Sequence, residues 1–133
     1  MHTDILFDTD RFNLSEAKPH FINDICFGDD AAAWLREQLL ALGIQAIEPA
    51  QEDWGWYIEA THAGSSYFIG VGGNPQAGAS YKNAGEWRIM IEKHRSLWDK
   101  LTGKNKLAPD EAILAIIRSI VAHEPDFSNL RED

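Results

Sequence analysis

The stretch that decides the fold is residues 54–71, which read WGWYIEATHAGSSYFIGV. Two runs rich in aromatic and β-branched residues are separated by a short turn that contains Gly64, which is the pattern of a β-hairpin. Side chains alternate along a strand, so each run has two distinct faces. One face of the first run is apolar and should point into the core, and it consists of Trp54, Trp56, Ile58 and Ala60.

Strand patterns continue on both sides of this hairpin. Residues 44–48 form a short strand candidate, and residues 86–93 alternate in the same way as the hairpin. With hairpin strands at 54–62 and 66–72, the sequence predicts a four-stranded antiparallel meander. Residues 72–85 contain four glycines and a proline, so we expect a long loop there.

Two amphipathic helices are predicted to cover this sheet. The first begins at Asp29, where acidic residues complement the helix dipole, and stops at Gly43, which suits a helix end. The second begins near Pro109 and cannot continue through Pro125. A shorter helix is expected over 95–101. The predicted fold class is therefore α+β, with two layers: the meander packs against a helix from the N-terminal half and a C-terminal helix.

The chain length of 133 residues predicts a single domain, because a chain of this size can bury a core of its own. Residues 1–28 are expected to be irregular, with a short strand, and residues 126–133 to form a polar, frayed tail. The single cysteine, Cys26, cannot form an internal disulfide, and the first residues lack the basic and apolar regions of a signal peptide. These features favour a soluble, cytoplasmic protein.

The charge is strongly acidic and unevenly distributed. The formal net charge is −9, and residues 1–53 hold eleven of the acids, whereas residues 93–106 are basic. An acidic body repels nucleic-acid phosphates and speeds the encounter with a basic partner. Acids that only keep the protein soluble would explain the same excess. We therefore expect no nucleic acid or membrane as partner.

No pattern points firmly to catalysis, a cofactor or a metal. The glycine-rich residues 70–75 lack both the dinucleotide fingerprint and the Gly-Lys-Ser/Thr ending of a phosphate-binding loop. Cys26 lies between Ile25 and Phe27, where a thiol is typically buried and inert. No closely spaced pair of histidines suggests a metal site. An enzyme is the less favoured interpretation, and no cofactor is predicted.

One alternative is a small enzyme or ligand-binding domain with a pocket under the loop 72–85. Its charged and histidine residues could meet near the ends of two strands, although solvated edge residues and a cross-strand ion pair explain them equally well. This alternative pocket would consist of Glu59, His62, Arg88, Glu92 and His94.

The favoured hypothesis is a non-enzymatic acidic module that binds a protein. A concrete version is an inhibitor or immunity-type protein that neutralises a basic partner such as a toxin. Acids would steer the encounter while aromatic, Met and Arg side chains on the outward sheet face anchor it. The partner-binding residues predicted on this basis are Asp29, Asp30, Glu48, Glu52, Asp53, Tyr57, Phe68, Arg88 and Met90. A third hypothesis is an adaptor that forms a homodimer through this face.

Overall fold

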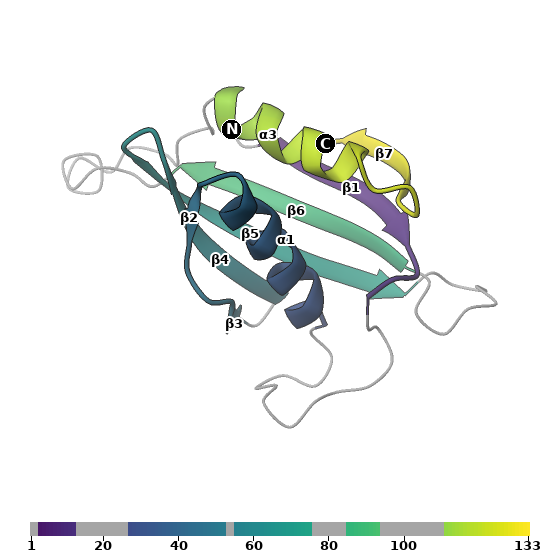
Figure 1. The fold of residues 1–133 in the computed structure, drawn as a ribbon. Coiled ribbons are helices and arrows are strands. Elements are labelled where there is room, and N and C mark those ends of the chain that lie inside the picture. Colours follow the sequence, from purple (N-terminus) through teal and green to yellow (C-terminus); the bar gives the residue numbers. More distant parts are fainter. Residues whose placement is uncertain (1–2, 13–26, 53–54, 76–84, 94–110) are drawn as a thin grey trace.

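The computed structural model describes residues 3–12, 27–52, 55–75, 85–93 and 111–133. Within these ranges the chain forms an antiparallel sheet with two helices packed on one face (Figure 1). The elements are β1 Thr3–Thr9, α1 Asp29–Ala41, β2 Gln45–Ala46, β3 Ala50–Glu52, β4 Gly55–His62, β5 Ser65–Pro75, β6 Gly85–Lys93, α3 Glu111–Ala122 and β7 Ser128–Glu132. No helix in these ranges is long and apolar enough to cross a membrane.

The sheet contains seven strands in the order β2-β4-β5-β6-β1-β7, and β3 also pairs with β4. The four strands of the predicted meander correspond to β2, β4, β5 and β6, which lie side by side in that order. The α+β class and the antiparallel sheet are thus confirmed, but β1, β3 and β7 enlarge the sheet beyond four strands. The central hairpin turns at Ala63 and Gly64, whose φ angles of 51° and 80° are those of a tight two-residue turn.

The core lies between the sheet and the helices. Alternate residues of β4, β5 and β6 point toward the helices, and the fully buried side chains among them include Ile58, Ile69, Trp87, Ile89 and Ile91. Helix α1 adds Leu35 and Leu39, and α3 adds Ile113 and Ile117. The apolar stripes predicted on both helices therefore meet the apolar side of the sheet in one continuous cluster.

Helix α1 ends as its sequence predicts. Gly43 has a φ of 79°, a conformation that favours glycine, and its N–H donates to the carbonyl of Leu40. The N–H of Ile44 donates to the carbonyl of Leu39. These two bonds form a Schellman motif, which satisfies carbonyls left free at the helix end and turns the chain toward β2.

Two segments differ from the sequence-based expectation. Both ends of the predicted loop 72–85 belong to strands, because β5 continues to Pro75 and β6 begins at Gly85, and residues 76–84 lie outside the described residues. The predicted frayed tail 126–133 contains β7, which pairs with β1. Its polar sequence gives no local sign of this strand, because β7 lies at the edge of the sheet and its partner β1 is far away in the chain. The helix predicted over 95–101 and the thiol of Cys26 lie outside the described residues.

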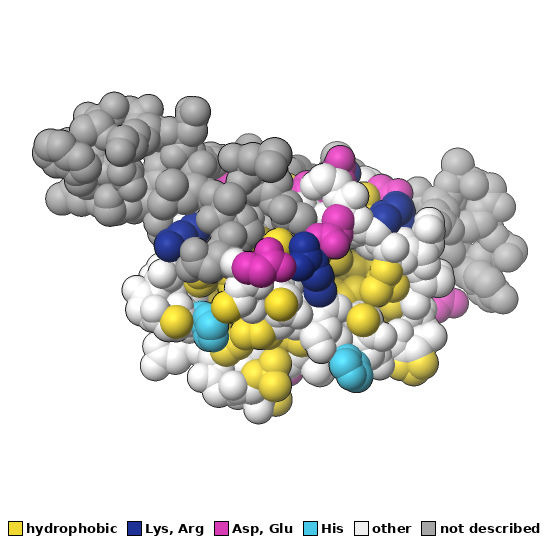
Figure 2. Space-filling model, turned by 90° about the horizontal axis from the view of Figure 1, so that it is seen from above, with side chains coloured by type: hydrophobic (Ala, Val, Ile, Leu, Met, Phe, Trp, Pro, Cys, Tyr) yellow, Lys and Arg dark blue, Asp and Glu magenta, His cyan; other side chains and the backbone are white. Residues whose placement is uncertain are grey.

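Ion pairs tie the chain from Glu124 onward to the rest of the fold. Arg11, Arg88, Arg118 and Arg131 each bind two carboxylates. The first three each have at least one partner among residues 124–133, whereas Arg131 lies in β7 itself and binds Asp8 of β1 and Glu86 of β6. Figure 2, seen from above the edge that α3 and β7 form, shows a basic side chain between acidic ones near the middle of the surface. Each arginine joins elements that are distant in sequence, with the exception of the Arg118–Glu111 contact inside α3.

The Arg11–Glu124 pair predicts a pH-dependent contribution to stability. The hydrogen bond from Arg11 lowers the pKa of Glu124 below its ordinary value of 4.5, and the Trp34 indole N–H donates to the same carboxylate. A lowered pKa stabilises the fold above pH 4.5, and this contribution disappears as the pH falls through the folded-state pKa. We expect Glu124→Gln to lower the free energy of unfolding at neutral pH by about 0.5–1 kcal/mol.

Urea titrations of both proteins across the acid range would test this expectation. The difference between wild type and Glu124→Gln should shrink as the pH falls from 4.5 through the lower folded-state pKa, below which the wild-type carboxyl is protonated too. Glu37→Gln, at an exposed position of α1, is the matched control and should change little at any pH. A difference that stays constant down to acid pH would show that the charge of Glu124 does not contribute.

Candidate functional site

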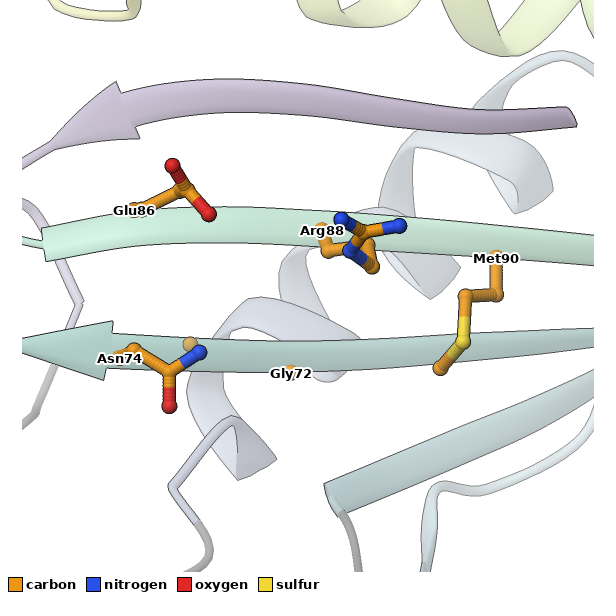
Figure 3. A pocket seen from close by; sticks show the side chains of 6 residues that line it. Gly72, Asn74, Glu86, Arg88 and Met90 are labelled. Atoms are coloured by element: carbon orange, nitrogen blue, oxygen red, sulfur yellow. The ribbon is translucent and has the colours of Figure 1, made fainter. Parts of the chain in front are cut away.

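The candidate site is the face of the sheet opposite the helices, which we call the outer face. The described helices both lie on the other side, and Figure 3 looks onto the outer face with α1 behind the strands. Strand alternation and register place its side chains, which come from β1, β4, β5, β6 and β7. They include Asp4, Leu6, Asp8, Tyr57, Glu59, Phe68, Asn74, Glu86, Arg88, Met90, Glu92 and Arg131.

An aromatic pair forms the apolar part of the outer face. The rings of Tyr57 and Phe68 stack with centroids 4.8 Å apart and an angle of 21° between their planes. In register, Gly70 lies opposite Tyr57 on one side and Met90 on the other. The side chains of Tyr57, Phe68 and Met90 are half-buried. Aromatic residues and Met are enriched at protein interfaces, so this composition suits a docking surface.

Two ion clusters form the polar part of the outer face. Arg88 donates to Asp4 and to Asp133, the latter at 3.1 Å from Nη1. Arg131 donates to Glu86 and, at 3.4 Å from Nη1, to Asp8. Each guanidinium therefore meets two carboxylates, and each cluster keeps one excess negative charge.

A buried apolar residue lies between the two arginines in register. Leu6 lies opposite Arg88 in one strand pairing and opposite Arg131 in the other, and it is only 5% exposed. Arginine commonly lays its aliphatic stem over apolar groups while its charged end stays in water. The outer face therefore carries charged side chains around β1 and aromatic side chains on β4 and β5.

The described part of the outer face is acidic. Among the described residues, the two guanidinium groups of Arg88 and Arg131 stand against six carboxylates, which gives a formal charge of −4. Those carboxylates belong to Asp4, Asp8, Glu59, Glu86, Glu92 and Asp133. A surface of one sign attracts partners of the opposite sign and speeds their association.

A small hollow opens between β5 and β6 on this face. Its lining consists of Gly72, Gly73, Asn74, Glu86, Arg88 and Met90, and its volume is about 140 Å³. Figure 3 shows Asn74 and Glu86 at one end, Met90 at the other and Arg88 between them. Gly72 lacks a side chain, which leaves room between the strands. Pockets for small molecules typically span roughly 300–1,000 Å³, so this hollow has the size for a single side chain.

The structure brings together four of the predicted partner-binding residues, namely Tyr57, Phe68, Arg88 and Met90. The three predicted acids whose side chains the structure describes do not join them. Asp29 and Asp30 begin α1 on the helix side, and Glu48 follows β2, where it lies 3.3 Å from Arg36. Asp53 and the side chain of Glu52 lie outside the described residues.

The predicted alternative pocket does not assemble in the described part of the chain. Glu59 and Glu92 both lie opposite Phe68 in register, one on each neighbouring strand, so they are two strand spacings apart, roughly 10 Å. Arg88 binds Asp4 and Asp133, which belong to other segments. His62 alternates to the helix side of β4, and His94 lies outside the described residues.

Sequence reasoning missed the acids that surround Arg88 and Arg131. Asp4 and Asp8 belong to β1, and Asp133 follows β7; their placement depends on strand pairings between residues more than 75 positions apart. Asp4 and Asp8 lie four residues apart in the run DILFD, so they would share one face of a strand. This is the one local signal that could have indicated a strand with a charged face.

Neither a metal-binding group nor a similar known protein gives further information on this site. Within the described ranges, no group of three or more His, Cys, Asp and Glu residues could hold a metal ion. Comparisons of the chain with protein-family models, curated proteins and solved structures found no match. The chemistry of the outer face is therefore the observation that bears on function.

Proposed function

We propose that this protein is a non-catalytic binding module that holds a basic protein on the outer face of its sheet. In its most specific form, the module is a cytoplasmic inhibitor or immunity-type protein that covers a basic partner such as a toxin. The observation that carries the proposal is the combination on one face of the stacked Tyr57–Phe68 pair with a formal charge of −4.

The two parts of this surface would have different roles in binding. Large aromatic side chains supply most of the affinity at protein interfaces when the partner excludes water from them. Charges at the rim act chiefly on the rate of association and on the choice of partner. An acidic border around an aromatic centre therefore favours a partner whose contact surface is basic with an apolar middle.

The two alternatives fit the outer face less well. A pocket enzyme would need a larger cavity and convergent polar groups, whereas the hollow measures about 140 Å³ and Glu59 and Glu92 flank Phe68. A homodimer through the outer face would bring two surfaces of charge −4 together, and juxtaposed like charges oppose association.

Binding measurements on a captured partner would test the proposal. The immobilised protein is used to capture partners from a cell extract, and each captured protein is then purified and titrated by calorimetry at low and high salt. We expect a basic protein whose affinity falls with salt. Replacing both aromatic residues, Tyr57→Ala with Phe68→Ala, should weaken its affinity about 30-fold or more, because the loss of even one hot-spot residue costs about 2 kcal/mol or more, which corresponds to about 30-fold.

Matched variants on other surfaces separate this effect from general surface changes. Leu40→Ala with Leu42→Ala removes two exposed apolar side chains, 40% and 59% exposed, at the end of α1 and away from the outer face, and should leave the affinity unchanged. Glu59→Gln with Glu92→Gln should slow association and reduce its salt dependence, whereas Glu37→Gln on α1 should not. A partner that responds to the Leu40 and Leu42 changes instead would overturn the assignment of the outer face.

A further inference from the structure

We infer that the hollow between β5 and β6 receives one basic side chain, lysine or arginine, from the partner. This inference rests on the proposed function and adds to it the chemistry of a specific contact. The hollow is defined by six residues of two neighbouring strands and lies beside the Tyr57–Phe68 pair, since Gly70 separates that pair from Met90 in register.

The shape of the hollow suits a long side chain with a polar end. Gly72 and Gly73 contribute only backbone, and Met90 supplies a polarisable apolar wall against which an aliphatic stem can pack. Asn74 and Glu86 lie together at the other end (Figure 3). A side chain that enters along β5 would thus place its stem beside Met90 and its charged end beside Glu86.

The charge around the hollow selects a cation. Arg88 and Arg131 already donate to four carboxylates, those of Asp4, Asp133, Asp8 and Glu86, so this group has a formal charge of −2. Arg88 lines the hollow, but its guanidinium is engaged by two acids and offers little to an incoming anion. Glu86 binds Arg131 through Oε2, and a carboxylate can accept several hydrogen bonds at once.

The end of the hollow offers acceptors for a new donor. The Glu86 carboxylate accepts only, and the Asn74 side chain adds an amide oxygen. Asn74 is exposed, so an incoming group can reach it without moving the strands. A lysine ammonium or an arginine guanidinium consists only of donors, which matches this end of the hollow.

Titration of the intact, 15N-labelled protein with small probes would test the inference directly. The probes are N-acetyl-arginine amide, N-acetyl-lysine amide and, as the acidic counterpart, N-acetyl-aspartic acid amide. We expect the basic probes to shift the amide signals of Gly72, Gly73 and Asn74 in a saturable manner. Glu86→Gln should weaken this binding at least threefold, while Glu37→Gln should not. Equal or stronger binding of the acidic probe, or shifts located elsewhere, would overturn the inference.

A second variant fills the hollow without removing charge. Gly72→Val introduces a strand-favouring side chain on the outer face and should abolish the shifts caused by the basic probes. If the captured partner depends on Tyr57 and Phe68 but binds Gly72→Val and Glu86→Gln as well as wild type, the inference fails while the proposed function stands. If the hollow binds the basic probes and no basic partner is captured, the proposed function fails instead.

Discussion

Gly73→Ala should lower the free energy of unfolding by about 2–3 kcal/mol and the midpoint of thermal unfolding by about 10 °C. A Cβ atom at this position would lie 2.7 Å from three ring atoms of Trp87, Cε2, Cζ2 and Cη2. The ring is fully buried and meets the Phe12 ring edge-on at a centroid distance of 5.3 Å. It therefore cannot withdraw without disturbing the packing on its other sides.

The neighbouring glycine supplies the control for this prediction. Gly72 belongs to the same strand but lies on the outer face, so Gly72→Ala should change the free energy of unfolding by about 0.5 kcal/mol or less. The double variant Gly73→Ala with Trp87→Phe should recover part of the loss, because phenylalanine lacks the outer ring that contains Cζ2 and Cη2. Urea unfolding of the variants measures both effects. Equal losses at the two glycines would contradict the proposed steric cause.

The central elements could be predicted from sequence because their signals are local. Residues 54–71 contain alternation, a turn glycine and β-branched residues within one window, and β4, β5 and their turn follow accordingly. Helix α1 starts and ends where Asp29 and Gly43 indicate. In these elements the signal and the structure it determines lie within about 20 residues of each other.

The edge of the sheet could not be predicted in the same way. Strand β7 has the sequence SNLRE, in which only Leu130 is apolar, and that side chain is itself 43% exposed. What holds this strand is its pairing with β1, together with ion pairs such as Arg118–Glu132. Such contacts join residues whose proximity exists only after the sheet has formed.

Only part of the candidate site could be predicted from sequence, for the same reason. Alternation within single strands places Tyr57, Phe68, Arg88 and Met90 on one face, and the sequence showed it. The acids beside them come from β1 and from the residues after β7, which no local pattern brings next to β6. The choice of Asp29 and Asp30 as steering acids followed the charge of a sequence segment, whereas the structure groups charges by sheet register.

Phe127→Ala should be among the most destabilising changes in this protein, with an expected loss of about 3–5 kcal/mol. The ring is 6% exposed and stacks on Phe7, with centroids 4.3 Å apart and planes 13° apart. It also meets Trp34 and Phe12 edge-on, and the Arg11 guanidinium lies 4.8 Å from its centroid. Its removal would leave a cavity lined by aromatic rings that are fixed by other contacts.

This change should act on β7 before it acts on the rest of the sheet. Phe127 directly precedes β7 and is the buried anchor between α3 and that strand, so its loss should remove the hydrogen-exchange protection of the β7 amides first. Leu130 lies within β7 but is 43% exposed, so Leu130→Ala is the matched control and should cost about 0.5 kcal/mol or less. Comparable effects of the two changes in urea unfolding would mean that ion pairs, rather than the aromatic cluster, hold residues 126–133 on the sheet.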